Sequence, residues 1–467
     1  MLDLAVEIGI DRRSGRTLTR QLIEGVRRLI QEGRLVEGDR LPSTRELAGS
    51  LGVSRNVAAE AYDQLAAEGY LAARVGSGSF VAEGVRPRPA GSPAPSREDA
   101  RPLAHPPTIR FNAGNPDLRA FPVAAWADSL KKAALRARER DLGYPSIMGL
   151  RELREALADY LLRSRGIRCS HRSILIVSGI AQGVDLLAKS LASSPERQAI
   201  VEDPSLEYVR NVFALNGYRL TPVPADEAGL RTEELPPASR ARFVYVVPSH
   251  HYPLGGILPI QRRAALVDYA RKTGAWIIED DYDSEFRYQG APVEPLFLLA
   301  PERVAYFGTF SKSMYPAIRL AYLVLPEELL SPVVEVKKAM NLFSATVEQA
   351  ALAEWIRAKR YDSHVYRMKR LYRRKRERLV RAVQGSLGGG ARVLGENAGL
   401  HLLLQFPDRP FDAATIERLR SEGLEIDWVE ESAIVKGRHR NEIVMGYGSL
   451  SEEEIDDGVR RLAELLR

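Results

Sequence analysis

Apolar residues in the first part of the chain recur at helical spacing in three stretches and then begin to alternate. Spacings of three and four residues predict helices within 18–33, 41–52 and 53–70. Ser43 or Thr44 is placed to cap the second helix and Ser54 the third, while Gly52 ends the second. Alternation on both sides of a Gly-Ser-Gly turn in 70–83 predicts a two-stranded wing. A short helix, a tight turn and a second helix form the pattern of a helix-turn-helix.

The segment from Gly84 to Arg110 lacks this periodicity and is rich in proline, alanine, arginine and serine. Such a composition is typical of a partly extended linker. We therefore expect a first domain over 1–83, a linker over 84–110 and a larger body over 111–467.

Beyond residue 173, short apolar runs alternate with amphipathic stretches. The runs are SILIVSG, QAIVEDP, RFVYVVPSH, AWIIEDDY and RVAYFGTFSK. Strands separated by helices are typical of an α/β fold whose mostly parallel sheet is covered on both faces. Ligands bind beyond the carboxyl ends of the strands in such sheets, so the residues that follow each run are candidate site residues.

Composition narrows the class of protein. At 467 residues, 45% of them hydrophobic, the chain is long enough for two or three domains. No apolar stretch is long enough to span a bilayer, and the N-terminus lacks the apolar core of a signal peptide, so we expect no membrane partner. Cys169 is the single cysteine, which fits the cytoplasm, and the seven histidines lack metal-ligand spacing, so we expect no metal site.

The net charge of +6 is unevenly distributed. Residues 1–85 contain eleven arginines, no lysine and twelve acidic residues, a balance of −1. The basic excess is most evident in 357–382. We interpret this segment as a long solvated helix that crosses from the large domain to the C-terminal domain. The alternative is a second DNA-binding surface.

The residues at the strand ends suit a phosphate, an aldehyde and a ring nitrogen. A helix start, two hydroxyls and a guanidinium suit a phosphate, while a lysine suits the aldehyde. An aspartate suits a cationic ring nitrogen, and a tyrosine suits a phenolate-like oxygen. Together these groups describe a site for pyridoxal 5′-phosphate (PLP). The candidates are Ile180, Ala181, Asp280, Tyr282, Thr309, Ser311, Lys312 and Arg319.

Each of these groups has another explanation when it is taken alone. The acidic run EDDYD is typical of a strand cap or a divalent-cation site, and Lys312 could bind a phosphate as in nucleotide sites. No Walker-type glycine pattern precedes Lys312, however, and the groups follow one another on successive strands. The order favours the PLP site.

The first domain resembles the winged helix-turn-helix of GntR-type transcription regulators, with cap, turn, second helix and Gly-Ser-Gly wing in order. The resemblance implies a partner, double-stranded operator DNA. Val57 departs from it, because family members usually carry threonine there. The positions that it implies as DNA contacts, from the second helix, the third helix and the wing, are Arg45, Ser54, Arg55, Asn56, Arg74 and Gly76.

The body resembles fold-type I aminotransferases through FNAGNPDLRAFP, YPSIMGLRELREALADYL, SGIAQGVDLL, VEDP, PSHHYPLGG, IIEDDYDSEFRY and GTFSKSMYPAIRLAYLVLP. Its nearest likeness is to the aminotransferase-like part of MocR/GabR-type regulators. That implies a mostly parallel sheet of the seven-stranded type, with a large domain over about 140–325 and a small α+β domain over about 330–467. It also implies a homodimer.

The same resemblance implies roles for single residues. Lys312 forms the Schiff base with PLP, Asp280 meets the pyridine nitrogen, and Tyr252 lines the cofactor site. Tyr144 reaches the site from a partner subunit. Asp281 is the alternative to Asp280, since the two acids are adjacent.

Three positions depart from that resemblance. Leu206 stands where the family has an aromatic residue that stacks on the cofactor, and Tyr252 where aminotransferases carry an asparagine. Val444 stands where aminotransferases carry the arginine that binds the substrate carboxylate. We therefore expect no efficient turnover.

We expect a PLP-dependent transcription regulator that senses an amino compound, or PLP itself. One alternative is an active aminotransferase with an appended DNA-binding module, in which Arg210 or Arg438 would bind the carboxylate. The other is a dimerisation body that keeps the cofactor site as a relic.

Overall fold

The computed structural model describes residues 7–12, 14–74, 78–85, 108–191, 196–237 and 239–467. The chain divides into two compact units, Met1–Leu103 and Ala104–Arg467. Most of the expected linker lies outside the described residues. No helix in the described ranges is long and apolar enough to cross a membrane.

The first unit has the three helices and the hairpin that the apolar spacing predicts. They are α2 (Leu18–Gln31), α3 (Thr44–Leu51), α4 (Arg55–Ala67), β1 (Leu71–Arg74) and β2 (Gly78–Val81). Ser43, not Thr44, caps α3 in a capping box with Glu46, and Gly52 ends it in the left-handed conformation. Leu22, Val26, Leu29 and the inner face of α4 form one buried core. The helix-turn-helix and its wing are confirmed.

A sheet of eight strands forms the centre of the second unit. The strands are β4 (Ile174–Val177), β5 (Gln198–Asp203), β6 (Arg219–Asp226), β7 (Gly229–Leu230), β8 (Phe243–Val246), β9 (Trp276–Asp281), β10 (Val304–Thr309) and β11 (Ala321–Val324). Their order is β4-β11-β10-β9-β8-β5-β6-β7. Strands β10, β9, β8, β5 and β6 run parallel, whereas β11 and β7 are antiparallel to their neighbours.

The sheet has one strand more than the seven expected, because the chain turns back after β6 and adds β7 at the edge. Only two residues of β7 pair, and Gly229 takes a positive φ of 79° at its start. So short a strand leaves no alternating pattern in the sequence.

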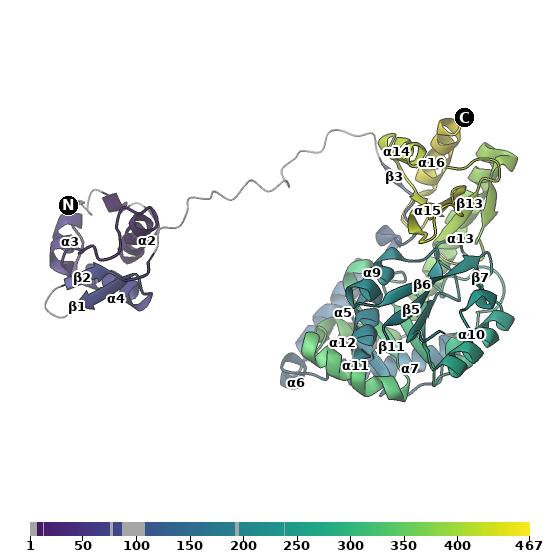
Figure 1. Cartoon of the computed structure of the whole chain (residues 1–467), viewed down its shortest axis with the longest axis horizontal. Coiled ribbons are helices and arrows are strands. Elements are labelled where there is room, and N and C mark those ends of the chain that lie inside the picture. The colour runs from purple at the N-terminus through teal and green to yellow at the C-terminus, as the bar shows by residue number, and fades with distance from the viewer. Residues whose placement is uncertain (1–6, 13, 75–77, 86–107, 192–195, 238) are drawn as a thin grey trace. The chain divides into compact units, whose positions relative to one another are not determined.

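Helices cover both faces of the sheet (Figure 1). One core includes side chains of α5 (Val123–Arg136), α7 (Arg151–Arg165), α10 (Ile260–Thr273) and α12 (Thr346–Arg357). The other includes side chains of α8 (Ile180–Ser190), α9 (Glu207–Leu215) and α11 (Glu327–Met340). Alternate residues of β4 enter the two cores: Ile174 and Ile176 face one, Leu175 and Val177 the other. The doubly covered α/β sheet is confirmed.

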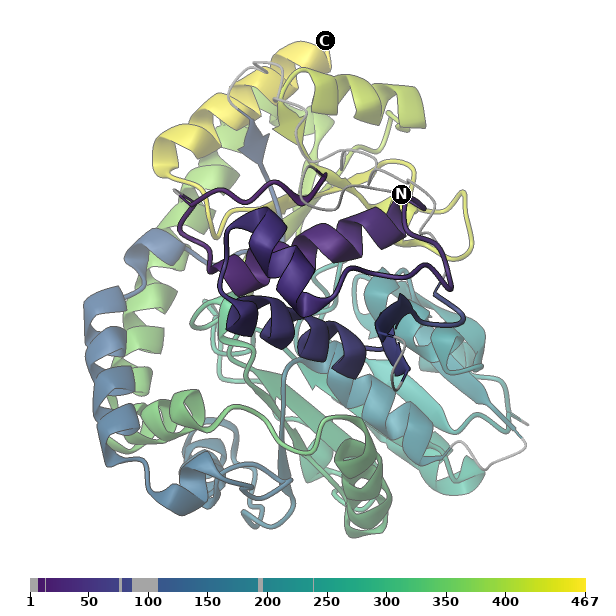
Figure 2. The same cartoon turned by 90° about the vertical axis from the view of Figure 1, so that its left-hand side faces the viewer.

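The C-terminal part forms a smaller α+β layer, drawn in yellow-green and yellow at one end of the second unit (Figure 2). Its sheet is β12 (Arg392–Leu394), β13 (His401–Gln405), β16 (Glu442–Gly446) and β15 (Asp427–Trp428), in that order. Helices α13 (Arg360–Leu387), α14 (Ala413–Ser421) and α16 (Glu452–Leu465) bury side chains in the same core. Two further strands, β3 (Ile109–Arg110) and β14 (Leu424–Glu425), pair with each other. Two short helices are α6 (Glu139–Leu142) and α15 (Val429–Ser432).

Helix α13 is the basic segment of the sequence. Tyr361 near its start is buried in the core of the large domain, whereas Met368, Tyr372 and Val383 are buried in the core of the small domain. The interpretation as a helix that crosses between the two domains is confirmed.

Candidate functional site

A cavity of about 770 Å³ lies at the carboxyl ends of the parallel strands. Nine of the ten residues expected at the cofactor site line it: Ile180, Ala181, Tyr252, Asp280, Tyr282, Thr309, Ser311, Lys312 and Arg319. They come from five separate segments, which the sheet brings together because its parallel strands end at one edge.

Lys312 follows the end of β10 and points its amine into this cavity. Its Nζ donates a hydrogen bond to the backbone oxygen of Gly114 at 2.7 Å. Burial lowers the pKa of Lys312, although the charges of Asp283 and Asp280 act in the opposite direction. A lowered pKa makes the unprotonated amine more available, and this is the form that attacks a carbonyl carbon.

The structure separates the two adjacent acids at the end of β9. Asp281 accepts from the Nη2 of Arg165 at 2.7 Å and from the hydroxyl of Tyr306, so it belongs to a buried ion pair. Asp280, unlike Asp281, lines the cavity. It accepts a hydrogen bond from the hydroxyl of Tyr245 at 2.6 Å through Oδ2, and the Oδ1 atoms of both acids are buried without a partner among the described residues. Burial raises the pKa of Asp280 to about 7. A buried acceptor without a donor fits a cationic N–H group from a ligand.

The other end of the cavity suits a phosphate. Arg319 has a left-handed backbone (φ 51°), and its guanidinium lies against Gly179, where a Cβ would be 3.0 Å from Nη2. Gly179 precedes α8, so the first N–H groups of that helix lie beside the guanidinium. The hydroxyls of Thr309 and Ser311 lie 3.1 Å apart. Within the described residues Arg319 makes no ion pair, so the guanidinium is available to an anion. These groups fit the phosphate of PLP.

Three tyrosines were expected here, and two line the cavity. The hydroxyl of Tyr282 donates to the backbone oxygen of His250 at 3.1 Å. Tyr252 packs edge-on against His401, with 5.7 Å between ring centroids. Tyr144 is 87% exposed and does not line the cavity of its own chain. Its ring lies 6.0 Å from that of Phe343.

Two of the residues that depart from the aminotransferase pattern, Leu206 and Val444, lie in different surroundings. Leu206 lines the cavity, and so does Tyr208, an aromatic residue two positions further on that the sequence analysis did not consider. Val444 lies in β16, is 1% exposed and packs in an apolar cluster with Leu403 and Val429, outside the cavity lining. Neither Arg210 nor Arg438 lines the cavity.

Several lining residues were not among the predicted site residues, although one of them, Asn112, lies within the FNAGNPDLRAFP motif. They are Asn112, Asn211, Asp427 and Ser432. Asp427 belongs to the small domain and enters the cavity only because β15 pairs with β16. No local pattern in the sequence indicates that pairing.

A buried polar cluster lies beside Tyr282. His250 Nδ1 and Asp283 Oδ2 are 2.9 Å apart, and the ring of His401 lies 4.6 Å from that of His250. Gly399 is required beside them, since a Cβ there would be 2.4 Å or less from atoms of His250 and Asp283. The fold thus gathers two histidines and an aspartate whose sequence positions showed no ligand spacing.

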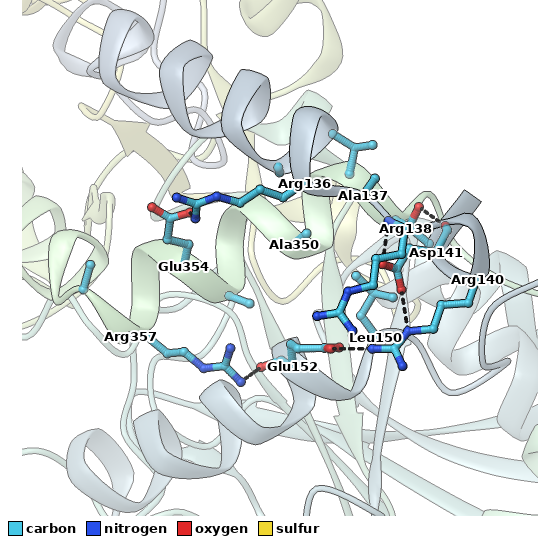
Figure 3. A pocket seen from close by; sticks show the side chains of 15 residues that line it. Arg136, Ala137, Arg138, Arg140, Asp141, Leu150, Glu152, Ala350, Glu354 and Arg357 are labelled. Carbon is cyan, nitrogen blue, oxygen red and sulfur yellow. Dashed lines mark hydrogen bonds and ion pairs between the residues drawn. The ribbon is translucent and has the colours of Figure 1, made fainter. Parts of the chain in front are cut away.

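A second cavity, of about 510 Å³, lies between α5, α6 and α12 (Figure 3). Its lining combines small apolar side chains with charged ones, and several of the charged side chains pair with one another. Arg136 lies 3.4 Å from Glu354, and Arg140 lies 3.9 Å from Glu152. It lacks the combination of lysine, unpartnered carboxylate and anion-binding helix start that marks the first cavity.

The DNA-contact candidates are exposed on the first unit. Arg45 lies in the first turn of α3, and Arg55 and Asn56 begin α4. Ser54 is exposed and also caps α4, accepting from the backbone N–H of Val57 at 3.4 Å. The guanidinium of Arg74 lies 5.0 Å from the ring centroid of Phe80, which holds it on the wing. Gly76 lies outside the described residues.

The acidic residues within 1–85, which give that stretch a net charge of −1, do not pair with these arginines. Among the described residues, Arg45, Arg55 and Arg74 make no ion pair, whereas four other arginines of the unit do. The paired ones are Arg16, Arg20, Arg27 and Arg34, whose partners are Glu24, Glu68 and Glu7. The motif therefore presents arginines that form no ion pair in the described structure, although residues 1–85 together carry a net charge of −1.

A winged helix-turn-helix joined to a body with an aminotransferase-type cofactor cavity defines a DNA-binding regulator built on an enzyme fold. Comparisons with known proteins agree. The description "Bacterial regulatory proteins, gntR family" matches residues 18–81, and "Aminotransferase class I and II" matches residues 106–436. The chain belongs to the MocR-type family of HTH-type transcriptional regulators, which carry these two parts in this order.

Individual relatives are similar over nearly their whole length. The chain is 35% identical to the uncharacterized HTH-type transcriptional regulator YhdI of Bacillus subtilis over 97% of this chain and 96% of that one. It is 34% identical to the pyridoxine biosynthesis transcriptional regulator PdxR of Corynebacterium glutamicum over 93% of each chain. Among solved structures, LysN, an α-aminoadipate aminotransferase of Thermus thermophilus, has a TM-score of 0.70 and 27% identity over 77% of this chain and 92% of that one.

Proposed function

We propose that the protein binds PLP on Lys312 and operator DNA through its N-terminal motif. An amino compound, or PLP itself, changes the DNA affinity when it binds in the body. The observation that carries this proposal is the convergence of three groups in one cavity. Lys312 has a lowered pKa, Asp280 has an unpartnered buried oxygen, and Arg319 stands beside a helix start.

Bound PLP supplies an aldehyde carbon that primary amines attack. In this chain Lys312 would hold that carbon, Asp280 would accept from the ring N–H, and Tyr282 would donate to the ring oxygen. Thr309 and Ser311 would hold the phosphate together with the guanidinium. The solved LysN structure is a complex with N-(5′-phosphopyridoxyl)-L-leucine, which supports the assignment of this cavity to a pyridoxyl group.

Regulation is favoured over turnover as the role of the body. Transamination requires the substrate carboxylate to be fixed so that the bond to be broken is correctly oriented. Val444 is buried outside the cavity, and Lys312 and Arg319 are the only cationic side chains in its described lining. An amine can therefore react with the aldehyde. The cavity, however, lacks the cationic side chain that would bind the carboxylate of an α-amino acid and so orient it.

We further propose a homodimer whose subunits complete one another's cavities. Large apolar side chains are exposed near α6 and after α11: Leu142 is 67% exposed, Tyr144 87% and Leu342 42%. The Tyr144–Phe343 contact places two of these segments together. Such a surface is typical of an interface, and it would allow Tyr144 to reach a partner's cavity. Leu142→Asp should produce monomers in sedimentation analysis and lower PLP affinity.

Double-stranded DNA as a partner and the single cysteine support a cytoplasmic location. In this proposal residues 1–83 bind DNA, 84–110 connect, and 111–467 bind the cofactor and pair the subunits.

The experiment that tests the whole proposal is a titration of the full-length protein with PLP, followed by amines, with operator affinity measured at each stage. The expected result is a near-visible absorbance band that amines alter, together with a change in DNA affinity. A protein that binds DNA with the same affinity at every stage would refute the regulatory role.

A further inference from the structure

The charges in the cofactor cavity are distributed in a way that bears on what else binds there. Lys312 and Arg319 are its cationic side chains among the described residues, and both are assigned to the cofactor. The remaining charged lining residues are acidic: Asp427 and Glu207, besides Asp280, which is assigned to the ring nitrogen. The part of the cavity beyond the cofactor is therefore negative.

Asp427 is placed where a carboxylate-binding arginine would project. Strands β15 and β16 pair antiparallel, with Asp427 directly opposite Val444. Residues opposite one another in an antiparallel pair have their side chains on the same face of the sheet. The side chain of Asp427 reaches the cavity, while that of Val444 remains in the apolar cluster against which Tyr252 packs. An acid thus lies beside the position at which aminotransferases carry a base.

The environment of Asp427 is that of a carboxylate in need of a cation. It is partly buried, and burial together with the charge of Glu431 raises its pKa, although the charge of Arg420 acts in the opposite direction. The backbone N–H of Ala113 is a hydrogen-bond partner, and no ion pair is found for Asp427 in the described part of the chain. A cation that entered the cavity would stabilise the charged form of Asp427. A ligand carboxylate would be repelled by Asp427.

We propose that the effector is a primary amine without a carboxylate that carries a second cationic group, a diamine in the simplest case, and that Asp427 recognises this second group. The proposal rests on the amine-sensing function proposed above. One amine reacts at the aldehyde carbon on Lys312, and the other end forms a charge-assisted hydrogen bond with Asp427. The hydroxyls and amides of Tyr252, Asn112 and Ser432 provide further polar lining.

The test compares three probes with the same five-carbon chain: 1,5-diaminopentane, pentylamine and 5-aminopentanoate. Each is titrated into the PLP-loaded full-length protein, with the near-visible absorbance and the operator affinity as separate readouts. Titration of free PLP with the same probes corrects for their intrinsic reactivity. We expect the diamine midpoint to lie about tenfold to 150-fold below that of pentylamine, the range of one charged hydrogen bond. The carboxylate should be the weakest probe.

Asp427→Asn should remove the preference for the diamine and leave the pentylamine midpoint unchanged. The matched control is Glu431→Gln, which removes one negative charge four residues away, from a side chain paired with Arg420 and outside the cavity lining. It should keep the diamine preference.

Equal midpoints for the three probes, or the tightest response to 5-aminopentanoate, would overturn the diamine inference and leave amine sensing intact. An equal loss for all three probes in Asp427→Asn would also overturn it, because Asp427 would then support the fold without recognising the ligand. A band that none of the amines changes, or no band after PLP addition, would instead refute the proposed function itself.

Discussion

Asp280→Asn should weaken PLP binding and at the same time stabilise the PLP-free protein. The asparagine oxygen can still accept from the Tyr245 hydroxyl, as Oδ2 of Asp280 does at 2.6 Å. Its NH₂ group then replaces the unpartnered Oδ1 and presents a donor to the ring N–H of the cofactor. Losing one charge-assisted hydrogen bond costs about 1.5–3 kcal/mol, so the dissociation constant for PLP should rise about tenfold to 150-fold.

The effect on the PLP-free protein has the opposite sign. Burial raises the pKa of Asp280 from 3.8 to about 7, so the folded state holds a proton that the unfolded state releases between those values. Stability therefore falls as the pH rises from about 4 to about 7, by about 1.4 kcal/mol per pH unit, and the total is on the order of 4 kcal/mol. Asparagine does not titrate, so the variant should gain up to this amount at pH 8 and lose the gain near pH 4.

Chemical unfolding of the PLP-free protein at pH 8 and pH 4, with PLP titration by absorbance, measures both effects. The control is the same change one residue further on. Asp281→Asn leaves the buried Arg165 without the negative charge that pairs with it and should destabilise the protein by about 3–5 kcal/mol. If Asp280→Asn binds PLP as tightly as the parent, or if its PLP-free form is destabilised at pH 8, the assignment of Asp280 to the ring nitrogen is refuted.

Four further results are expected. Borohydride reduction of the PLP-loaded protein should attach the cofactor to Lys312 by mass spectrometry, and an adduct on another lysine would move the site. Lys312→Ala should abolish effector-dependent transcription yet retain operator binding, because the DNA-binding unit has its own core; loss of gel-shift affinity would contradict this independence. Arg45→Ala and Arg55→Ala should each weaken operator binding by about 1–3 kcal/mol where a base contact is lost, so unchanged gel-shift affinity at fixed salt would argue against these contacts. With common amino acids and 2-oxoglutarate, keto-acid production should stay far below the ordinary enzyme range of about 1–1000 per second, and turnover within that range would favour the aminotransferase alternative.

Much of the fold and of the cavity could be predicted because short stretches of sequence determine both the elements and the residues that follow them. Caps such as Ser54, helical spacing and short apolar runs identify elements without knowledge of their partners. Parallel strands end at one edge, so the residues after each run could be gathered into one site before any contact was known. Asp280 and Lys312 were found in this way, and both line the cavity.

What the sequence could not provide depends on contacts between distant segments. The choice between Asp280 and Asp281 follows from Arg165, a residue more than a hundred positions earlier. The cluster of His250 and His401 joins loops of the large domain to a strand of the small one. Asp427 enters the cavity through a strand pairing that only two residues of β15 make. None of these contacts has a local signature.

Helix α13 acts as a lever between the two cores of the second unit. Its 28 residues run without interruption, and the stretch from Tyr361 to Val383 spans about 33 Å at the helical rise per residue. Side chains near its two ends are buried in different cores, so the helix couples the two cores mechanically. A tilt of about 5° at the Tyr361 end moves the Val383 end by about 3 Å. If the helix stays straight, a small rotation of its first turn in the large domain would displace the small domain by several ångströms.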